Sequence, residues 1–283
     1  MNSNHAVTST VSSISQLQHA RPFLKWAGGK TQLIPEILAR FPKVFRKYHE
    51  PFMGGGAVFF ALAPNRAILS DINADLVDTY RAIRDEPEAV ISALQRHQVT
   101  EADYYRVRSQ KRGELSLVAA AARTIYLNRT CYNGLYRVNL KGEFNVPFGR
   151  YANPTICNSE NLYLASLALQ NVKIRCEDAL AIDKRVQRGD LVYFDPPYDP
   201  LSPTSSFTTY ARGGFGNEQQ AALADLFIKL ANRGVHVVLS NSDTPFIREL
   251  YRDFRIDSVY ARRAINSRAD RRGHVREVIV SVA

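Results

Sequence analysis

Cysteine and long apolar runs are both scarce in this sequence, and each shortage excludes a class of protein. The three cysteines among its 283 residues, Cys131, Cys157 and Cys176, are widely spaced and odd in number, which suits neither a disulfide framework nor a zinc site. No apolar run approaches the ~20 residues that a membrane-spanning helix needs. We therefore expect a protein of the reducing cytoplasm, with no membrane segment and no bound metal.

Acidic residues are also few relative to basic ones. The formal net charge is +10, and residues 100–175 alone contain eleven Lys/Arg against five Asp/Glu. Such a concentrated excess is typical of a surface that binds a polyanion, although a generally basic, solvated surface is the alternative. Hydrophobic residues make up 45% of the chain, which is ample for a packed core.

The strongest motif is Asp-Pro-Pro-Tyr at Asp195–Tyr198. It follows the apolar run Leu191–Phe194, which predicts a buried strand that ends at the prolines because they offer no N–H to a ladder. The carboxyl edge of an α/β sheet is where ligands bind. There Asp195 and the backbone carbonyl of Pro196 would accept from an amino group, and the Tyr198 ring would stack on a planar base. The alternative is a turn built from common turn-forming residues.

A glycine-rich segment predicts a second site, for a cofactor. Tyr48–Phe52 predicts a short strand and Ala57–Ala63 the start of a helix, with Met53–Gly56 between them. Glycines allow the backbone to approach a ligand closely. Phe59 stands where a dinucleotide-binding pattern needs its third glycine, which favours a smaller nucleoside ligand.

Three more side chains are candidates for this cofactor corner. Trp26 and Lys30 would supply an aromatic wall and a charge for a carboxylate, and their alternatives are a core residue and a solvated surface charge. Gly29–Thr31 is not part of a P-loop, because Leu24 stands where that motif needs a glycine. Asp71, at the end of the next predicted strand, suits ribose hydroxyls and equally suits the cap of the following helix.

Residues 100–171 interrupt the alternation of strands and helices. Leu117–Asn128 predicts a helix, and alternating residues on both sides of Lys141–Gly142 predict a β-hairpin. Its Arg and Asn side chains suit the edges of guanine and adenine, whereas the alternative is a solvated subdomain packed on the sheet. Further on, Arg255–Tyr260 and Val275–Val282 predict a closing antiparallel hairpin.

Taken in order, these motifs resemble the Dam-type site-specific DNA adenine (N6) methyltransferase family. The resemblance runs from Arg21 almost to the C-terminus, and it rests on Lys25–Lys30, Glu50–Gly56, Ser70–Asn73, Tyr132–Asn139, Phe144–Gly149 and Asp195–Tyr198. It implies methyl transfer from S-adenosylmethionine to the exocyclic N6 amine of an adenine flipped out of duplex DNA. The segment Asn133–Asn139 looks like that of GATC methylases, so GATC is the expected site.

Transferred to the matching positions, the resemblance implies three sets of site residues and no metal. The catalytic residues would be Asp195, Pro196, Pro197 and Tyr198. The cofactor would be bound by Trp26, Lys30, Phe52, Gly54, Gly56, Asp71, Asp178 and Asp195. DNA would be bound by Arg129, Asn133, Tyr136, Arg137, Asn139, Lys141 and Arg150.

The implied fold is α/β: a Rossmann-like S-adenosylmethionine-dependent methyltransferase sheet with an antiparallel last strand. We expect a disordered tail over residues 1–20, a catalytic domain over 21–99 and 172–283, and a mostly helical DNA target-recognition insertion over 100–171 that carries the hairpin. We also expect a mobile loop at 205–216 to close over the substrate. A monomer suffices for one flipped base per active site, in the cytoplasm of a bacterial or phage-infected cell. At work the enzyme would be associated with the nucleoid, and the sequence is compatible with restriction-modification, a phage role or genome regulation.

Three other interpretations compete with this one. A methyltransferase of RNA adenine or of the cytosine amine would use the same Asp-Pro-Pro-Tyr chemistry. A catalytically silent DNA-binding protein would need a broken cofactor corner, and the candidate residues are all in place. A dinucleotide oxidoreductase is disfavoured by the missing third glycine.

Overall fold

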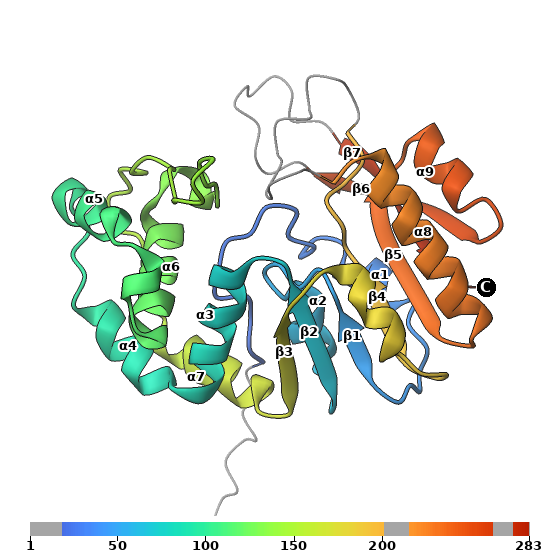
Figure 1. Ribbon diagram of the computed structural model, residues 1–283, viewed down its shortest axis with the longest axis horizontal. Coiled ribbons are helices and arrows are strands. Elements are labelled where there is room, and N and C mark those ends of the chain that lie inside the picture. Colours follow the sequence, from blue (N-terminus) through green and yellow to red (C-terminus); the bar gives the residue numbers. More distant parts are fainter. Residues whose placement is uncertain (1–18, 201–214, 263–273, 283) are drawn as a thin grey trace, which may run out of the picture.

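Seven strands form a single sheet at the centre of the molecule (Figure 1). The computed structural model describes residues 19–200, 215–262 and 274–282, so most of the expected tail and of the loop at 205–216 lies outside the described residues. The strands are β1 (Tyr48–Glu50), β2 (Ala67–Asp71), β3 (Val172–Cys176), β4 (Leu191–Phe194), β5 (His236–Ser242), β6 (Arg255–Arg262) and β7 (His274–Ser281). Their order is β3-β2-β1-β4-β5-β7-β6.

The first five strands of the sheet are parallel, and the other two close it in antiparallel register. β1 pairs with β2 and β4, β2 with β3, and β4 with β5, all in parallel. β7 lies antiparallel between β5 and β6. The expected α/β fold with an antiparallel last strand is thereby confirmed.

Helices cover both faces of the sheet and extend beyond one end of it (Figure 1). They are α1 (Ile34–Leu38), α2 (Ala57–Leu62), α3 (Ala74–Asp85), α4 (Pro87–Gln95), α5 (Glu101–Ser109), α6 (Leu117–Thr130), α7 (Ser159–Leu169), α8 (Asn217–Asn232) and α9 (Pro245–Leu250). Figure 1 shows α4, α5 and α6 gathered at one end of the molecule and α8 and α9 at the other. No helix within the described ranges has both the length and the apolar character needed to cross a membrane.

Successive side chains of β4 point to opposite faces of the sheet and so belong to two different parts of the hydrophobic core. Leu191 and Tyr193 belong to one hydrophobic cluster, whereas Val192 and Phe194 belong to the other, together with α8. All four side chains are fully buried, as expected for a parallel central strand covered on both faces. This strand therefore holds the residues that follow it in a fixed position.

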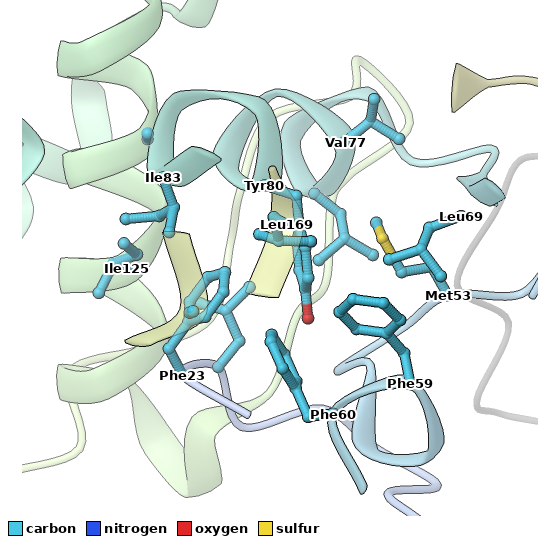
Figure 2. Packing of buried hydrophobic residues seen from close by; sticks show 14 of the residues in the cluster. Phe23, Met53, Phe59, Phe60, Leu69, Val77, Tyr80, Ile83, Ile125 and Leu169 are labelled. Carbon is cyan, nitrogen blue, oxygen red and sulfur yellow. The ribbon is translucent and has the colours of Figure 1, made fainter. Parts of the chain in front are cut away.

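The segment expected to be an insertion shares the larger hydrophobic cluster with the sheet. Tyr104, Ile125 and Leu162 lie in the same cluster as Leu69 of β2, and Figure 2 shows Ile125 beside Ile83 of α3. α6 packs against α3 and α4. Residues 100–171 thus form no separate core in the part described, and their boundaries as a recognition domain stay a prediction.

The expected β-hairpin is looser than a regular ladder. Among the described residues, its two sides form isolated bridges at Val138–Phe144 and Cys131–Phe148 rather than strands. The chain reverses at Lys141–Gly142, where Gly142 has a φ of 81°. We call residues 131–149 the recognition hairpin below.

Candidate active site

Asp195 lies directly after β4, and two side chains hold one of its carboxylate oxygens. Lys30 Nζ lies 2.8 Å from Asp195 Oδ1, and Ser240 Oγ donates a 3.0 Å hydrogen bond to the same atom. The Tyr193 hydroxyl lies 2.8 Å from Ser240 Oγ and donates to it, because the Ser240 proton is already directed at Asp195. Burial raises the pKa of Asp195, and the Lys30 charge opposes that shift. Both contacts use Oδ1, so within the described part of the chain Oδ2 is left as an acceptor for a ligand.

A chain of buried amides fixes the turn after Asp195. Gln220 Nε2 donates to the Pro197 carbonyl at 2.9 Å, and Asn241 Nδ2 donates to Gln220 Oε1 at 3.0 Å. Asn241 Oδ1 in turn accepts from the backbone N–H of Asp199 at 3.0 Å. Buried amides that are satisfied in this way hold a single geometry. The turn is therefore supported by both β5 and α8, which a simple end of a strand does not require.

The Tyr198 ring is fixed at its hydroxyl and covered on one face. The hydroxyl donates to Glu277 Oε2 on β7 at 2.8 Å. Lys30 Nζ lies 4.5 Å from the ring centroid, a cation–π distance. Burial raises the pKa of Tyr198 well above its usual value, so the hydroxyl remains a neutral donor.

Four of these supporting residues were missed in the sequence. Ser240 and Asn241 gave a signal, because they belong to a polar run, Ser240–Ser242, that directly follows the apolar run Val237–Leu239. Both side chains are fully buried, and buried polar groups need partners. Gln220 and Glu277 gave no local signal. They lie 23 and 79 residues away from the turn residues that they contact.

The glycine turn between β1 and α2 has a backbone conformation that favours glycine. Gly54 and Gly56 have φ values of 48° and 64°, in the left-handed region that favours glycine. A Cβ on Gly54 would lie 3.0 Å from Trp26 Cδ1, and one on Gly56 would lie 2.9 Å from the Tyr80 hydroxyl oxygen. Both conformation and space therefore require glycine at these positions.

Asp71 ends β2, and its carboxylate accepts hydrogen bonds from the backbone of two segments, the glycine turn and the start of α3. Its Oδ2 accepts from Gly54 N at 3.1 Å and its Oδ1 from Asn73 N at 2.9 Å. Burial raises the pKa of Asp71, and these backbone N–H groups oppose the shift. Asn73 caps α3, since its side chain accepts from Leu76 N. The helix-cap interpretation of Asp71 is therefore wrong, and its contact with ribose hydroxyls stays a prediction.

Lys30 and Trp26 lie where the cofactor corner meets the catalytic turn. Only 6% of Lys30 is exposed, so the interpretation as a solvated charge is wrong. Its ammonium contacts Asp195 and also donates to the Gly28 carbonyl. Trp26 is partly exposed and lies against the glycine turn. The structure thus brings both predicted sites together around one lysine.

The remaining cofactor candidates, Phe52 and Asp178, lie at the same edge of the sheet but differ in their contacts and exposure. Phe52 packs edge-on against Phe194, with ring centroids 6.4 Å apart. Asp178 is exposed, and its carboxylate accepts from Leu180 N at the start of a short 3-10 helix. Ile72, which the sequence analysis missed, is 62% exposed directly after Asp71 and offers an apolar surface beside it.

The DNA-binding candidates divide into exposed residues and residues directed inward. Asn133, Arg137, Lys141 and Arg150 are exposed. Asn139 organises the hairpin tip, where its Oδ1 accepts from the backbone of Lys141 and Glu143. The other two face the protein: Arg129 donates to the Phe23 carbonyl, and the Tyr136 hydroxyl donates to Asp75. This geometry favours a supporting role for those two.

Comparison with known proteins gives a consistent result along nearly the whole chain. The family model described as D12 class N6 adenine-specific DNA methyltransferase matches residues 26–265. The type II methyltransferase M1.LlaDCHI of Lactococcus lactis subsp. cremoris is 46% identical over 92% of this chain and 95% of its own length. The type II methyltransferase M.MjaIII of Methanocaldococcus jannaschii is 44% identical over 89% and 95%. The DNA adenine methylase of Escherichia coli K12 is 40% identical over 92% and 94%.

Proposed function

Since this chain belongs to the D12 class N6 adenine-specific DNA methyltransferase family, we propose that its active site is the corner formed by Asp195 and Tyr198. S-adenosylmethionine would donate the methyl group there, and the substrate would be an adenine in duplex DNA. We further propose that the enzyme acts as a monomer with residues 100–171 as its target-recognition part. GATC is the proposed site, from the resemblance of Asn133–Asn139 to GATC methylases.

The observation that carries this proposal is the pairing of a partly buried carboxylate with a fixed aromatic ring at the end of β4. Asp195 Oδ2 and the Pro196 carbonyl can each accept one hydrogen of an exocyclic amine. The Tyr198 ring, held by Glu277, can stack on the base that carries it. Flipping the adenine out of the duplex to reach this corner costs a few kcal/mol.

The residues of the cofactor corner fit S-adenosylmethionine. Trp26 and Tyr80 leave no room for a Cβ at Gly54 or Gly56, so these positions stay glycine and backbone alone would border the ligand there. We assign the ribose hydroxyls to Asp71 and the methionine carboxylate to Lys30. Ile72 and Asp178 would border the adenine ring. When bound, the cofactor supplies a methyl group on a sulfonium, which is a strong electrophile.

The protein's own residues would prepare the amine for attack. The lone pair of an exocyclic amine is delocalised into its ring, and acceptors on both hydrogens move electron density back to the nitrogen. Lys30 favours the charged form of Asp195, and Ser240 fixes its orientation. Asp195 need not be a strong base, because the acidity of the N6 proton rises once the nitrogen is methylated. The proton then leaves to solvent through Asp195.

DNA would be read by the exposed face of the recognition hairpin. Arg137 can pair bidentately with a guanine edge, and Asn133 offers an amide to an adenine edge. Lys141 and Arg150 suit phosphates, which fix the register without reading sequence. The type II names of two relatives favour a role in restriction-modification, whereas the third relative is named only as a DNA adenine methylase.

The test is methyl transfer from labelled S-adenosylmethionine to unmethylated genomic DNA, followed by sequencing that detects N6-methyladenine in context. Methyladenine at one short motif would support the proposal and give the site. Transfer to RNA but not to DNA would contradict the proposed substrate. Binding of cofactor and DNA without any transfer would instead favour the silent DNA-binding protein.

A further inference from the structure

Two neighbouring residues of the recognition hairpin face opposite ways. Arg137 is exposed, and its guanidinium contacts only the hairpin itself among the described residues, through Asn145. Tyr136 faces the protein interior. Successive side chains of an extended segment point to opposite sides, so whatever fixes Arg137 from outside also fixes Tyr136 inside.

Tyr136 contacts three separate elements. Its hydroxyl donates to Asp75 Oδ2 in the first turn of α3 at 2.8 Å. Its ring lies against Trp26, with centroids 5.3 Å apart and planes at 31°. On the hairpin side it meets Phe144 edge-on at 5.8 Å. One side chain thus joins the recognition hairpin to the segment that holds Trp26.

Trp26 continues the contact to the cofactor corner. A Cβ on Gly54 or Gly55 would come within 3.0 or 3.2 Å of Trp26 atoms, so the indole lies directly on the glycine turn. The backbone N–H of Gly54 donates to Asp71, the proposed ribose ligand. A continuous path therefore leads from Arg137 through Tyr136, Trp26 and Gly54 to Asp71.

We propose that Tyr136 is a positioning residue that couples binding of the target DNA to binding of the cofactor. The inference rests on the function proposed above. DNA that holds the hairpin would hold Tyr136 against Trp26 and so restrict the glycine turn. The first ligand to bind bears the entropy cost of restricting the turn, and the second ligand does not bear it again. Each ligand should therefore bind more tightly when the other is present.

The experiment measures this coupling directly. The dissociation constant of S-adenosylhomocysteine, a non-reactive probe, is measured by calorimetry with and without a duplex that carries the mapped methylation site. The reciprocal measurement, DNA affinity with and without S-adenosylhomocysteine, must give the same factor. For the wild type we expect a factor of about five or more, within the usual range of coupling between sites.

Two variants and a matched control separate coupling from simple support of the fold. Tyr136→Phe removes the hydrogen bond to Asp75. The Asp75 carboxylate is not left unpaired, because Arg112 Nε lies 2.5 Å from its Oδ1. The matched control, Tyr104→Phe, removes a similar hydrogen bond to the same hairpin, the one to the Val146 carbonyl. That carbonyl still accepts from Arg108 at 3.1 Å. Tyr136→Ala also removes the ring from Trp26. We expect the coupling factor to fall in Tyr136→Phe, to approach one in Tyr136→Ala, and to be unchanged in Tyr104→Phe.

The outcomes distinguish this inference from the function on which it rests. A wild type that methylates DNA but shows a coupling factor of one would overturn the inference alone. So would an unchanged factor in both Tyr136 variants, or an equal fall in Tyr104→Phe. If Tyr136→Ala does not fold, the coupling factors of Tyr136→Phe and Tyr104→Phe can still be compared, and that comparison decides whether the inference holds. A wild type that binds neither S-adenosylhomocysteine nor DNA would overturn the proposed function itself.

Discussion

At the scale of single residues, the carboxylate of Asp195 is the group on which methyl transfer should depend. Asp195→Asn keeps the acceptor for Ser240 but removes the charge beside Lys30 and replaces one acceptor oxygen with an amide donor. We expect methyl transfer to fall by about 10²-fold or more, a typical cost of losing one aligned hydrogen-bonding group at a reacting centre, with the circular dichroism spectrum unchanged. Asp183→Asn, which weakens the ion pairs of that carboxylate with Lys229 and Arg233 far from the catalytic turn, should keep the wild-type rate. Full activity of Asp195→Asn in the labelled-methyl assay would contradict the assignment.

Glu50 is a second residue with a measurable consequence, here for stability. It is fully buried beneath the active site and accepts from the Tyr48 hydroxyl at 2.8 Å. Burial raises its pKa from 4.5 to about 8, against the effect of the Tyr48 bond. The folded state therefore keeps a proton that the unfolded chain releases above pH 4.5, so this contribution to stability is lost as the pH rises toward about 8.

The variant Glu50→Gln should remove this dependence, because glutamine has no proton to lose. Between pH 5 and pH 8 we expect the urea midpoint of the wild type to fall more than that of Glu50→Gln. The check is equilibrium unfolding at several pH values in one buffer series. Parallel profiles would show that Glu50 does not hold its proton in the folded state.

At the scale of elements, the turn between β1 and α2 depends on two glycines. Gly56→Ala would place a methyl group 2.9 Å from the Tyr80 hydroxyl at a φ of 64°. We expect a loss of roughly 1–2 kcal/mol in the free energy of unfolding from the backbone conformation alone. Weaker binding of S-adenosylhomocysteine should accompany it, as calorimetry can measure.

A matched control is available in Gly113. A Cβ there meets nothing within 4 Å, and the residue has no positive φ. Gly113→Ala should therefore leave both the thermal midpoint and cofactor affinity at wild-type values. Equal losses in the two variants would mean that the turn at Gly56 has no special role.

The same elements show what the sequence could and could not predict. Leu191–Phe194 predicted β4 correctly because four buried apolar residues followed by prolines carry their signal locally. The alternation around Val138 predicted a ladder, but within the described residues the hairpin forms only isolated bridges, and Tyr136 packs on the distant Trp26 as well as on Phe144 of the facing segment. The contact of Glu277 with Tyr198 had no local signal, because it depends on β7 lying antiparallel beside β5.

At the scale of the whole molecule, the positive charge and the cofactor corner occupy different parts of one folded unit. The recognition hairpin belongs to the stretch with the largest charge excess, while the core beneath it is continuous with that of the sheet. A polyanion attracted to the hairpin is therefore brought to a surface that is packed on the same core as the sheet. We then expect some residues of the hairpin to contribute to DNA affinity and others to recognition of the DNA sequence.

Lys141 and Arg137 should show that separation in the salt dependence of DNA binding. Each phosphate contact contributes about 0.9 to the slope of log affinity against log salt. Lys141→Ala should lower the slope by about that amount and weaken binding equally for all sequences. Arg137→Ala should reduce discrimination between the target and a mismatched duplex by about 1–3 kcal/mol.

The control for both is Lys229→Ala, which removes an equal charge near the end of α8, close to the amino edge of β5. Because that edge is opposite to the one that bears Asp195, we expect neither the slope nor the discrimination to change. Fluorescence anisotropy with labelled duplexes between 50 and 200 mM salt, about the range over which such contacts are resolved, gives both quantities. An unchanged slope in Lys141→Ala, or a fall as large in Lys229→Ala, would show that the charge acts through the net field of the protein and not through contacts of the hairpin.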